Sequence, residues 1–95
     1  MALFVLLCVD HPGGLERRMS VREAHLAYVR EKLEMMKVAG PILNDAGEMA
    51  GSMFVIEAPD KAAVEAFNAA DPYTKAGVFA RVELHPWKVT VGALA

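Results

Sequence analysis

Apolar runs and amphipathic segments alternate along this chain, and their order predicts four strands and two helices. The run 3–9 is apolar at every position, which is typical of a strand covered on both faces. The runs 38–43 and 52–56 predict a second and a third strand, separated by the turn residues 44–47. Because Pro41 has no N–H to donate, the second strand should lie at an edge of the sheet.

A fourth strand is predicted from the alternation of apolar and polar residues over Val78 to His85. The charged residues fall on one face of this strand, which should therefore be the wetter face. One face would carry Val78, Ala80, Val82 and Leu84, and the other Phe79, Arg81, Glu83 and His85. Residues 88–91 are compatible with a short extra strand.

The first helix is predicted over residues 21–36, where apolar residues recur at helical spacing and fall within one narrow stripe. Ser20 and Glu23 have the spacing of a capping box, so this helix should open at Ser20. Residues 10–19 would then be a loop, either a solvated connector or a mobile flap that brings Arg17 or Arg18 over a pocket. The stripe consists of Leu26, Val29, Leu33 and Met36.

A second helix should begin at Asp60, whose side chain can cap it, and continue with an apolar inward face. Asp71 ends this helix, because a residue before proline is displaced from the helical region. Residues 72–76 can add one turn that stops at Gly77, and Asp71 would be the N-cap of that turn.

The resulting order, β-α-β-β-α-β, predicts a single domain over residues 1–95 with the ferredoxin-like α+β fold and an antiparallel sheet. In that topology the first and third strands are central, as their apolar character requires. Two helices cover only one face of such a sheet. Since the run 3–9 is apolar on both faces, we expect a homodimer in which two sheets pack face to face.

Composition narrows the function classes. The net charge of −2 lacks the basic footprint of a nucleic-acid-binding protein. The single cysteine, Cys8, allows neither an intrachain disulfide nor a cysteine metal cluster, and we interpret it as a small buried hydrophobic residue. The run 3–9 is too short for a signal peptide or a membrane span, so a cytoplasmic protein without a membrane partner is expected.

No cofactor or metal is expected. The three histidines, at positions 11, 25 and 85, have no spacing that is typical of metal ligands. The chain also lacks a phosphate loop, a dinucleotide fingerprint and a nucleophile elbow.

Arg22 and His25 interrupt the apolar side of the first predicted helix, and three residues of separation let their side chains touch. Because a buried charge is costly unless it is paired, this pair indicates a pocket. There, His25 would be a general base or acid, and Arg22 would bind a carboxylate or an enolate. Alternatively, His25 is a half-buried histidine bonded to backbone and Arg22 reaches water.

Asp71 also has two interpretations. It can be a helix cap with no other role. A carboxylate near His25 would instead hold one imidazole tautomer and stabilise the protonated ring. The separation of 46 residues along the chain leaves both interpretations open.

Several short motifs occur in order along the chain: Leu15-Glu16-Arg17-Arg18, Arg22-x-x-His25-Leu26, Ala39-Gly40-Pro41, Gly51-Ser52, Asp71-Pro72-Tyr73, Ala76-Gly77 and Pro86-Trp87. None of them is specific alone, but the ordered set, from Leu3 to about Val89, resembles the YCII-related family. The resemblance implies a ferredoxin-like fold assembled as a dimeric α+β barrel.

The resemblance also implies a site built on a histidine and an aspartate, which correspond to His25 and Asp71. It places Arg18, Arg22 and Ser52 among the polar residues around the pocket, as candidates for binding a substrate. Similar barrels include isomerases of lactones and a dehydrochlorinase of a chlorinated aromatic compound. This analogy favours proton transfer on small unsaturated anions.

Three functions follow as hypotheses. The chain can be a cofactor-free enzyme of the isomerase or lyase type. In that case His25 moves a proton on a small anionic organic molecule, Asp71 orients His25, and Arg22 with Arg18 holds the anion. It can be a binding module that captures such an anion without converting it. It can also be a dimerisation domain in which the same polar residues form a buried network.

Overall fold

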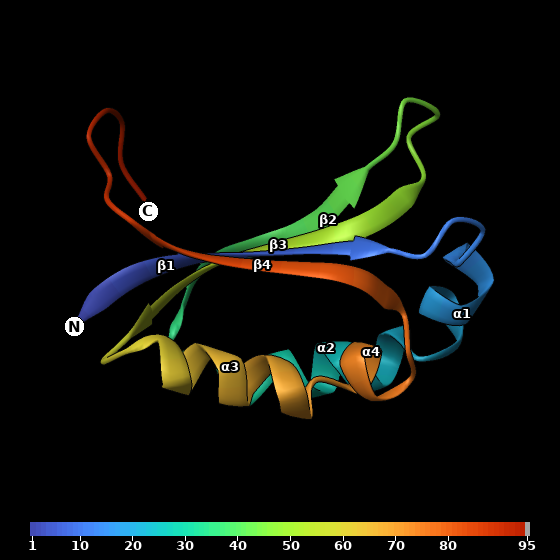
Figure 1. Cartoon of the computed structure of the whole chain (residues 1–95), viewed down its shortest axis with the longest axis horizontal. Coiled ribbons are helices and arrows are strands. Elements are labelled where there is room, and N and C mark those ends of the chain that lie inside the picture. The colour runs from blue at the N-terminus through green and yellow to red at the C-terminus, as the bar shows by residue number, and fades with distance from the viewer. Residues whose placement is uncertain (95) are drawn as a thin grey trace.

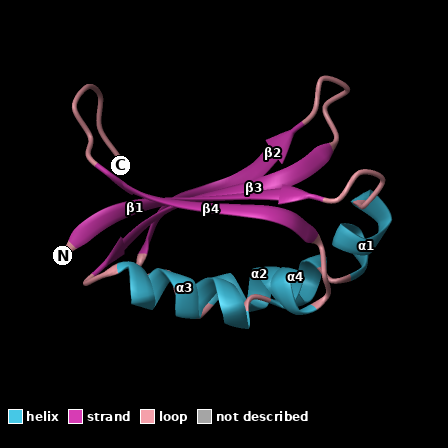
Figure 2. Ribbon diagram, viewed as in Figure 1, coloured by secondary structure: helices cyan, strands magenta, loops and turns pink. Residues whose placement is uncertain are grey.

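The computed structural model describes residues 1–94 as a four-stranded antiparallel sheet with a layer of helices beneath one face (Figure 1, Figure 2). The strands occur in the order β2-β3-β1-β4. None of the helices in residues 1–94 is long and apolar enough to span a membrane. The strands are β1 (Ala2–Asp10), β2 (Met36–Leu43), β3 (Met49–Ala58) and β4 (Phe79–Trp87), and the helices are α1 (Leu15–Ser20), α2 (Arg22–Arg30), α3 (Lys61–Ala70) and α4 (Pro72–Lys75).

The expected ferredoxin-like α+β fold is confirmed, with β1 and β3 in the centre and β2 and β4 at the edges. Helices α2, α3 and α4 lie under the sheet, whereas α1 lies beyond the end of β1 (Figure 1). Alternate side chains of the central strands fill the space between the two layers. The buried core cluster consists of Phe4, Leu6, Cys8, Phe54, Ile56, Ala58, Val64 and Phe67.

The helix predicted over residues 21–36 begins within one residue of its expected start, but another helix precedes it and it ends early. The chain is already helical at Leu15, and the helix is interrupted at Val21, which separates α1 from α2. At the other end α2 stops at Arg30, because turns over 31–35 must reverse the chain into β2. Leu33 therefore lies outside the apolar stripe and is 61% exposed.

The capping box and the flap are also absent from this part of the chain. The Ser20 hydroxyl donates to the carbonyl of Arg17, and the N-cap of α2 is Val21, which makes no side-chain cap hydrogen bond. The loop expected over residues 10–19 is shorter in the structure and covers only residues 11–14. Asp10 is the last residue of β1, and α1 begins at Leu15.

The fourth strand differs from its expected alternation at its first residues. Asp10 pairs with Phe79 and Val9 pairs with Arg81, so Ala80 is an extra residue in β4. This irregularity turns Phe79 toward the helices, where it packs against the core. Residues 88–91 form no strand in the described chain.

The two aspartate caps are confirmed. The Asp60 carboxylate accepts a hydrogen bond from the Ala63 amide at 3.0 Å, and α3 follows. The Asp71 carboxylate accepts one from the Tyr73 amide at 2.9 Å at the start of α4. Gly77 ends that turn with a φ of 72°, a backbone conformation that residues other than glycine rarely adopt.

Candidate functional site

A pocket of about 90 Å³ lies between α2 and the β2–β3 edge of the sheet, where the polar pair on the first helix predicts one. Its walls combine apolar side chains with convergent polar groups, which is typical of a small-molecule site. The lining residues are Arg18, Arg22, His25, Leu26, Ala39, Gly40, Pro41, Met49, Ser52, Phe54 and Tyr73.

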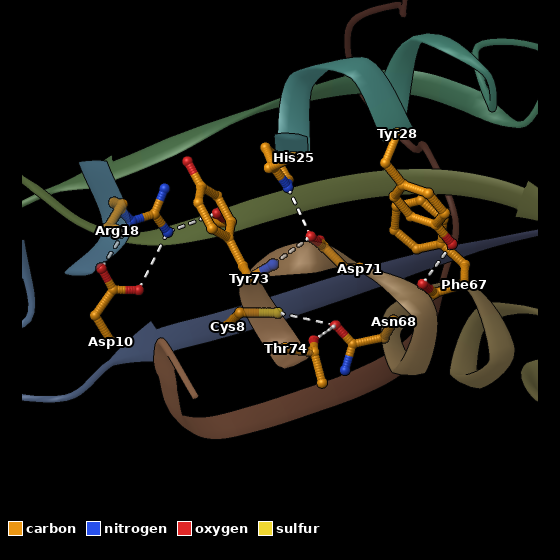
Figure 3. Close-up of polar contacts among 11 residues, drawn as sticks. Cys8, Asp10, Arg18, His25, Tyr28, Phe67, Asn68, Asp71, Tyr73 and Thr74 are labelled. Carbon is orange, nitrogen blue, oxygen red and sulfur yellow. Dashed lines mark hydrogen bonds and ion pairs between the residues drawn. The ribbon is translucent and has the colours of Figure 1, made fainter. Parts of the chain in front are cut away.

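His25 and Asp71 are in direct contact at the base of this site (Figure 3). His25 Nδ1 lies 2.8 Å from Asp71 Oδ1, and both residues are buried. Because a carboxylate oxygen accepts, Nδ1 carries the proton and donates it. In the neutral ring this leaves a lone pair on Nε2, which makes no hydrogen bond to the residues that the structure describes.

Asp71 combines the two roles that the sequence left open. Its Oδ1 accepts from the Tyr73 amide as the cap of α4 and from His25 at the same time. Its Oδ2 is buried and has no hydrogen-bond partner among the described residues. The side chain of Asp71 is fully buried, so solvent does not compete for Oδ1.

Arg18 is fixed by a buried network at one side of the pocket. Its Nε donates to Asp10 Oδ2 at 2.7 Å, and Nη2 donates to Asp10 Oδ1 at 3.1 Å and to Ser52 Oγ at 2.8 Å. Both charged side chains are almost completely buried. This bidentate pair ties α1 to β1 and β3, while Nη1 of Arg18 makes no hydrogen bond to the described residues.

Asp10 was missed by the sequence analysis, which assigned it to a loop. A charged residue directly after a continuously apolar strand is a signal that could have indicated a buried partner. Its partner, Arg18, was expected to contact a ligand from a flap, but it lies in α1 with its charge already paired.

Arg22 differs from Arg18 because it has no ion pair with any of the described residues. It lines the pocket from the first turn of α2 and is partly exposed. Arg17 lies outside the pocket lining and donates from Nη1 to the carbonyl of Gly77. Of the three arginines considered from the sequence, Arg22 offers the pocket an unpaired positive charge.

Tyr73 is the second residue that the sequence analysis left without a role. Its ring stacks on the His25 ring with 3.9 Å between centroids and 14° between planes. On the other side, the guanidinium carbon of Arg18 lies 4.4 Å from the Tyr73 centroid. The motif Asp71-Pro72-Tyr73 contains this residue, but only the tertiary structure gives its neighbours.

Cys8 is confirmed as a buried residue of the core. Its thiol lies 3.8 Å from Oδ1 of Asn68 (Figure 3). Burial, followed by the negative charge of Asp71, raises the pKa of the Cys8 thiol to about 12. The thiol therefore stays protonated and is a poor nucleophile.

Within residues 1–94, no group of three or more His, Cys, Asp and Glu side chains is arranged to hold a metal ion. The polar groups of the pocket are instead hydrogen-bond donors and a histidine, which suit an anionic or oxygen-rich organic molecule.

The fold and this pocket define a small α+β protein with a buried histidine–aspartate pair. The chain belongs to the YCII-related domain family, whose model matches residues 2–88. Protein YciI of Escherichia coli O6:H1 is 36% identical over 94 residues, which are 90% of this chain and 96% of that protein. An uncharacterized protein of Haemophilus influenzae is 32% identical over 93 residues, 90% of this chain and 95% of the relative.

A solved structure is similar over most of the chain. It is the 5-chloro-2-hydroxyhydroquinone dehydrochlorinase TftG of Burkholderia phenoliruptrix AC1100, in complex with 2,5-dihydroxybenzoquinone. The TM-score is 0.84 at 37% sequence identity, with 90% of this chain and 93% of that chain covered. Small-molecule catalysis therefore occurs in a structural neighbour of this protein.

Proposed function

We propose that this protein catalyses proton transfer on a small anionic organic molecule without a cofactor. The observation that carries the proposal is the buried 2.8 Å contact between His25 Nδ1 and Asp71 Oδ1. The carboxylate of Asp71 accepts a hydrogen bond from Nδ1–H, so the neutral ring has its basic nitrogen, Nε2, free at the pocket. A histidine held in one tautomer by a buried carboxylate is suited to general acid–base catalysis.

Asp71 is the positioning residue in this reaction. When Nε2 takes a proton from the substrate, the imidazolium forms beside the carboxylate, and their attraction lowers the energy of that state. The ring can then return the proton to another atom of the same substrate or to a leaving group. Isomerisation and elimination both need these two proton transfers, one from the substrate and one back to it or to a leaving group.

The charged and hydroxyl groups of the pocket would hold the substrate anion. Arg22 is unpaired and can bind a carboxylate, a phenolate or an enolate. The Ser52 hydroxyl accepts from Arg18 Nη2, so its own proton is free to donate to a substrate oxygen. Arg18 Nη1 is a further donor. As negative charge develops on an oxygen, these groups stabilise it.

The solved neighbour supports a substrate of this kind. TftG is a dehydrochlorinase of a hydroxyhydroquinone and was solved with a dihydroxybenzoquinone. Such a molecule is a small, planar, unsaturated ring that carries ionisable oxygens. We propose that the substrate of this protein belongs to the same chemical class, and we name no particular compound.

The experiment is a thermal-shift screen of hydroxyquinones, phenols, lactones and small carboxylates, followed by an assay for conversion of each compound that binds. We expect binding to the unmodified protein and conversion of at least one compound. His25→Ala and Asp71→Asn should each lower turnover at least about 100-fold, which is the usual contribution of a general acid–base group. Arg22→Gln should weaken binding about tenfold through loss of a charge-assisted contact.

The matched control is Arg17→Gln, which removes an arginine outside the pocket and should leave binding and turnover unchanged. A ligand that binds and is never converted would favour the non-catalytic binding module. No ligand, together with a much lower melting temperature of His25→Ala, would favour a buried structural network. Either result contradicts the proposal.

A further inference from the structure

Tyr73 lies at the centre of a stack of three flat side chains (Figure 3). The Arg18 guanidinium lies over one face of the phenol ring, and the His25 imidazole lies nearly parallel to the other face. The Tyr73 side chain is buried, with 1% of its surface exposed, and it also lines the pocket. Within the stack, the Tyr73 ring contacts both of the other side chains.

Arg18, at one end of the stack, is tied to the sheet. Arg18 is held by hydrogen bonds to Asp10 on β1 and Ser52 on β3. The Tyr73 ring therefore packs against a guanidinium that is hydrogen-bonded to two strands of the sheet. The His25 ring rests in turn on Tyr73, although it projects from α2.

The backbone of Tyr73 acts on the same imidazole by a second route. Its amide donates to Asp71 Oδ1, the oxygen that accepts from His25 Nδ1. Thus Tyr73 fixes the carboxylate through its N–H and the plane of the imidazole through its ring. Any residue except proline would supply this amide, so the flat face of the ring is the contribution specific to Tyr73.

We propose that Tyr73 is a positioning residue of the proton-transfer site, whose ring face orients His25 and stabilises its protonated form. A cation over an aromatic face is attracted by the ring quadrupole, and an imidazolium stacked at 3.9 Å is such a cation. The charge of Arg18 on the far face is compensated by its pair with Asp10. Burial raises the pKa of the Tyr73 hydroxyl above its ordinary value, so the phenol stays neutral.

This inference rests on the proposed function only in calling His25 a proton-transfer group. Its test needs no substrate. The pH titration of the assigned His25 ring protons is followed by NMR in the unmodified protein, Tyr73→Phe and Tyr73→Leu. The phenylalanine variant keeps the aromatic face, whereas the leucine variant keeps only apolar volume.

We expect the titration midpoint of His25 to be the same in the Tyr73→Phe variant and in the unmodified protein. In Tyr73→Leu it should fall by roughly half to one pH unit, the size of a moderate cation–π contact. The His25 ring protons should also resonate upfield in the first two proteins, because they lie over an aromatic face, and lose this shift in the third.

An unchanged midpoint in a folded Tyr73→Leu variant would overturn the inference. So would an equal fall in Tyr73→Phe, since the hydroxyl rather than the face would then be responsible. If Tyr73→Leu does not fold, Tyr73→Met replaces it in the comparison. If the His25 ring protons of the unmodified protein show no upfield shift, that result alone refutes the inference. Failure of the ligand screen leaves these titrations interpretable, so the two proposals fail separately.

Discussion

At the scale of single residues, burial decides what the ionisable groups of this protein can do. Cys8 lies near the C-terminal end of β1, among the core residues, and its thiol is shielded from water. Asp71 adds a negative charge in its neighbourhood. Both effects disfavour the thiolate, and together they raise the pKa of the Cys8 thiol to about 12.

This shift predicts a loss of stability at alkaline pH. In the unfolded chain the thiol ionises near pH 9, whereas the folded chain keeps the proton until about pH 12. Stability is therefore unaffected well below pH 9 and falls as the pH rises above it, because the unfolded state is favoured by losing the proton. Between pH 9 and pH 10 the free energy of unfolding should drop by about 1 kcal/mol.

Urea denaturation at the two pH values measures this drop, with Cys8→Ala as the control. The alanine variant should be less stable at every pH but should lack the component that the thiol contributes. The comparison stops at pH 10, since burial also raises the pKa of Tyr28 and Tyr73, which add a drop of the same sign at higher pH. Equal slopes in the two proteins would show that the thiol titrates normally.

At the scale of secondary-structure elements, a helix cap that forms can be compared with an expected cap that does not form. Asp60 caps α3, whereas Ser20 precedes α2 without capping it. We predict that Asp60→Ala lowers the free energy of unfolding by about 1 kcal/mol, the usual value of an N-cap. Ser20→Ala should cost less than about 0.5 kcal/mol, as is usual for an exposed site. Chemical denaturation of both variants measures this, and equal losses would contradict the observed cap geometry.

The strands and α3 could be predicted from the sequence because their signals are local. An uninterrupted apolar run identifies β1, and an aspartate followed by an amphipathic segment identifies α3. The break at Val21 could not be predicted, because Ser20 and Glu23 match a capping box that the backbone does not use. The position of Phe79 depends on an extra residue opposite β1, which has no local signature.

For the candidate site too, the sequence predicts what depends on neighbouring residues and misses what depends on tertiary contacts. The pocket at Arg22 and His25 was predicted from the polar interruption of an apolar helix face. The contact of His25 with Asp71 was implied by the family resemblance, since 46 residues separate them. Asp10 and Tyr73 were missed because their importance arises only from residues that the folded chain brings beside them.

At the scale of the whole molecule, one face of the sheet has no helical cover (Figure 2). Central residues of that face pair across the strands, as Val5 does with Val55 and Leu7 with Met53. Met53 is 40% exposed and Val38 is 52% exposed. Exposed apolar surface of this kind is typical of a protein interface, and we propose that a second copy of the chain covers it.

Met53→Lys tests this proposal, because a charge in the centre of the face cannot be buried without a partner. The unmodified protein should sediment as a dimer and the variant as a monomer. Leu33→Lys is the control: Leu33 is 61% exposed in the turn after α2, outside the sheet, and its substitution should leave the dimer intact. A monomeric unmodified protein would refute the face-to-face homodimer.

The shared oxygen of Asp71 has one more consequence. Two donors from different parts of the chain, the Tyr73 amide and the His25 ring, converge on Oδ1. The hydrogen bond that nucleates α4 therefore also aims the histidine. If α4 unfolds locally, the Asp71 carboxylate moves away from the imidazole at the same time. The ability of His25 to transfer a proton therefore depends on a four-residue helix that is distant in the sequence.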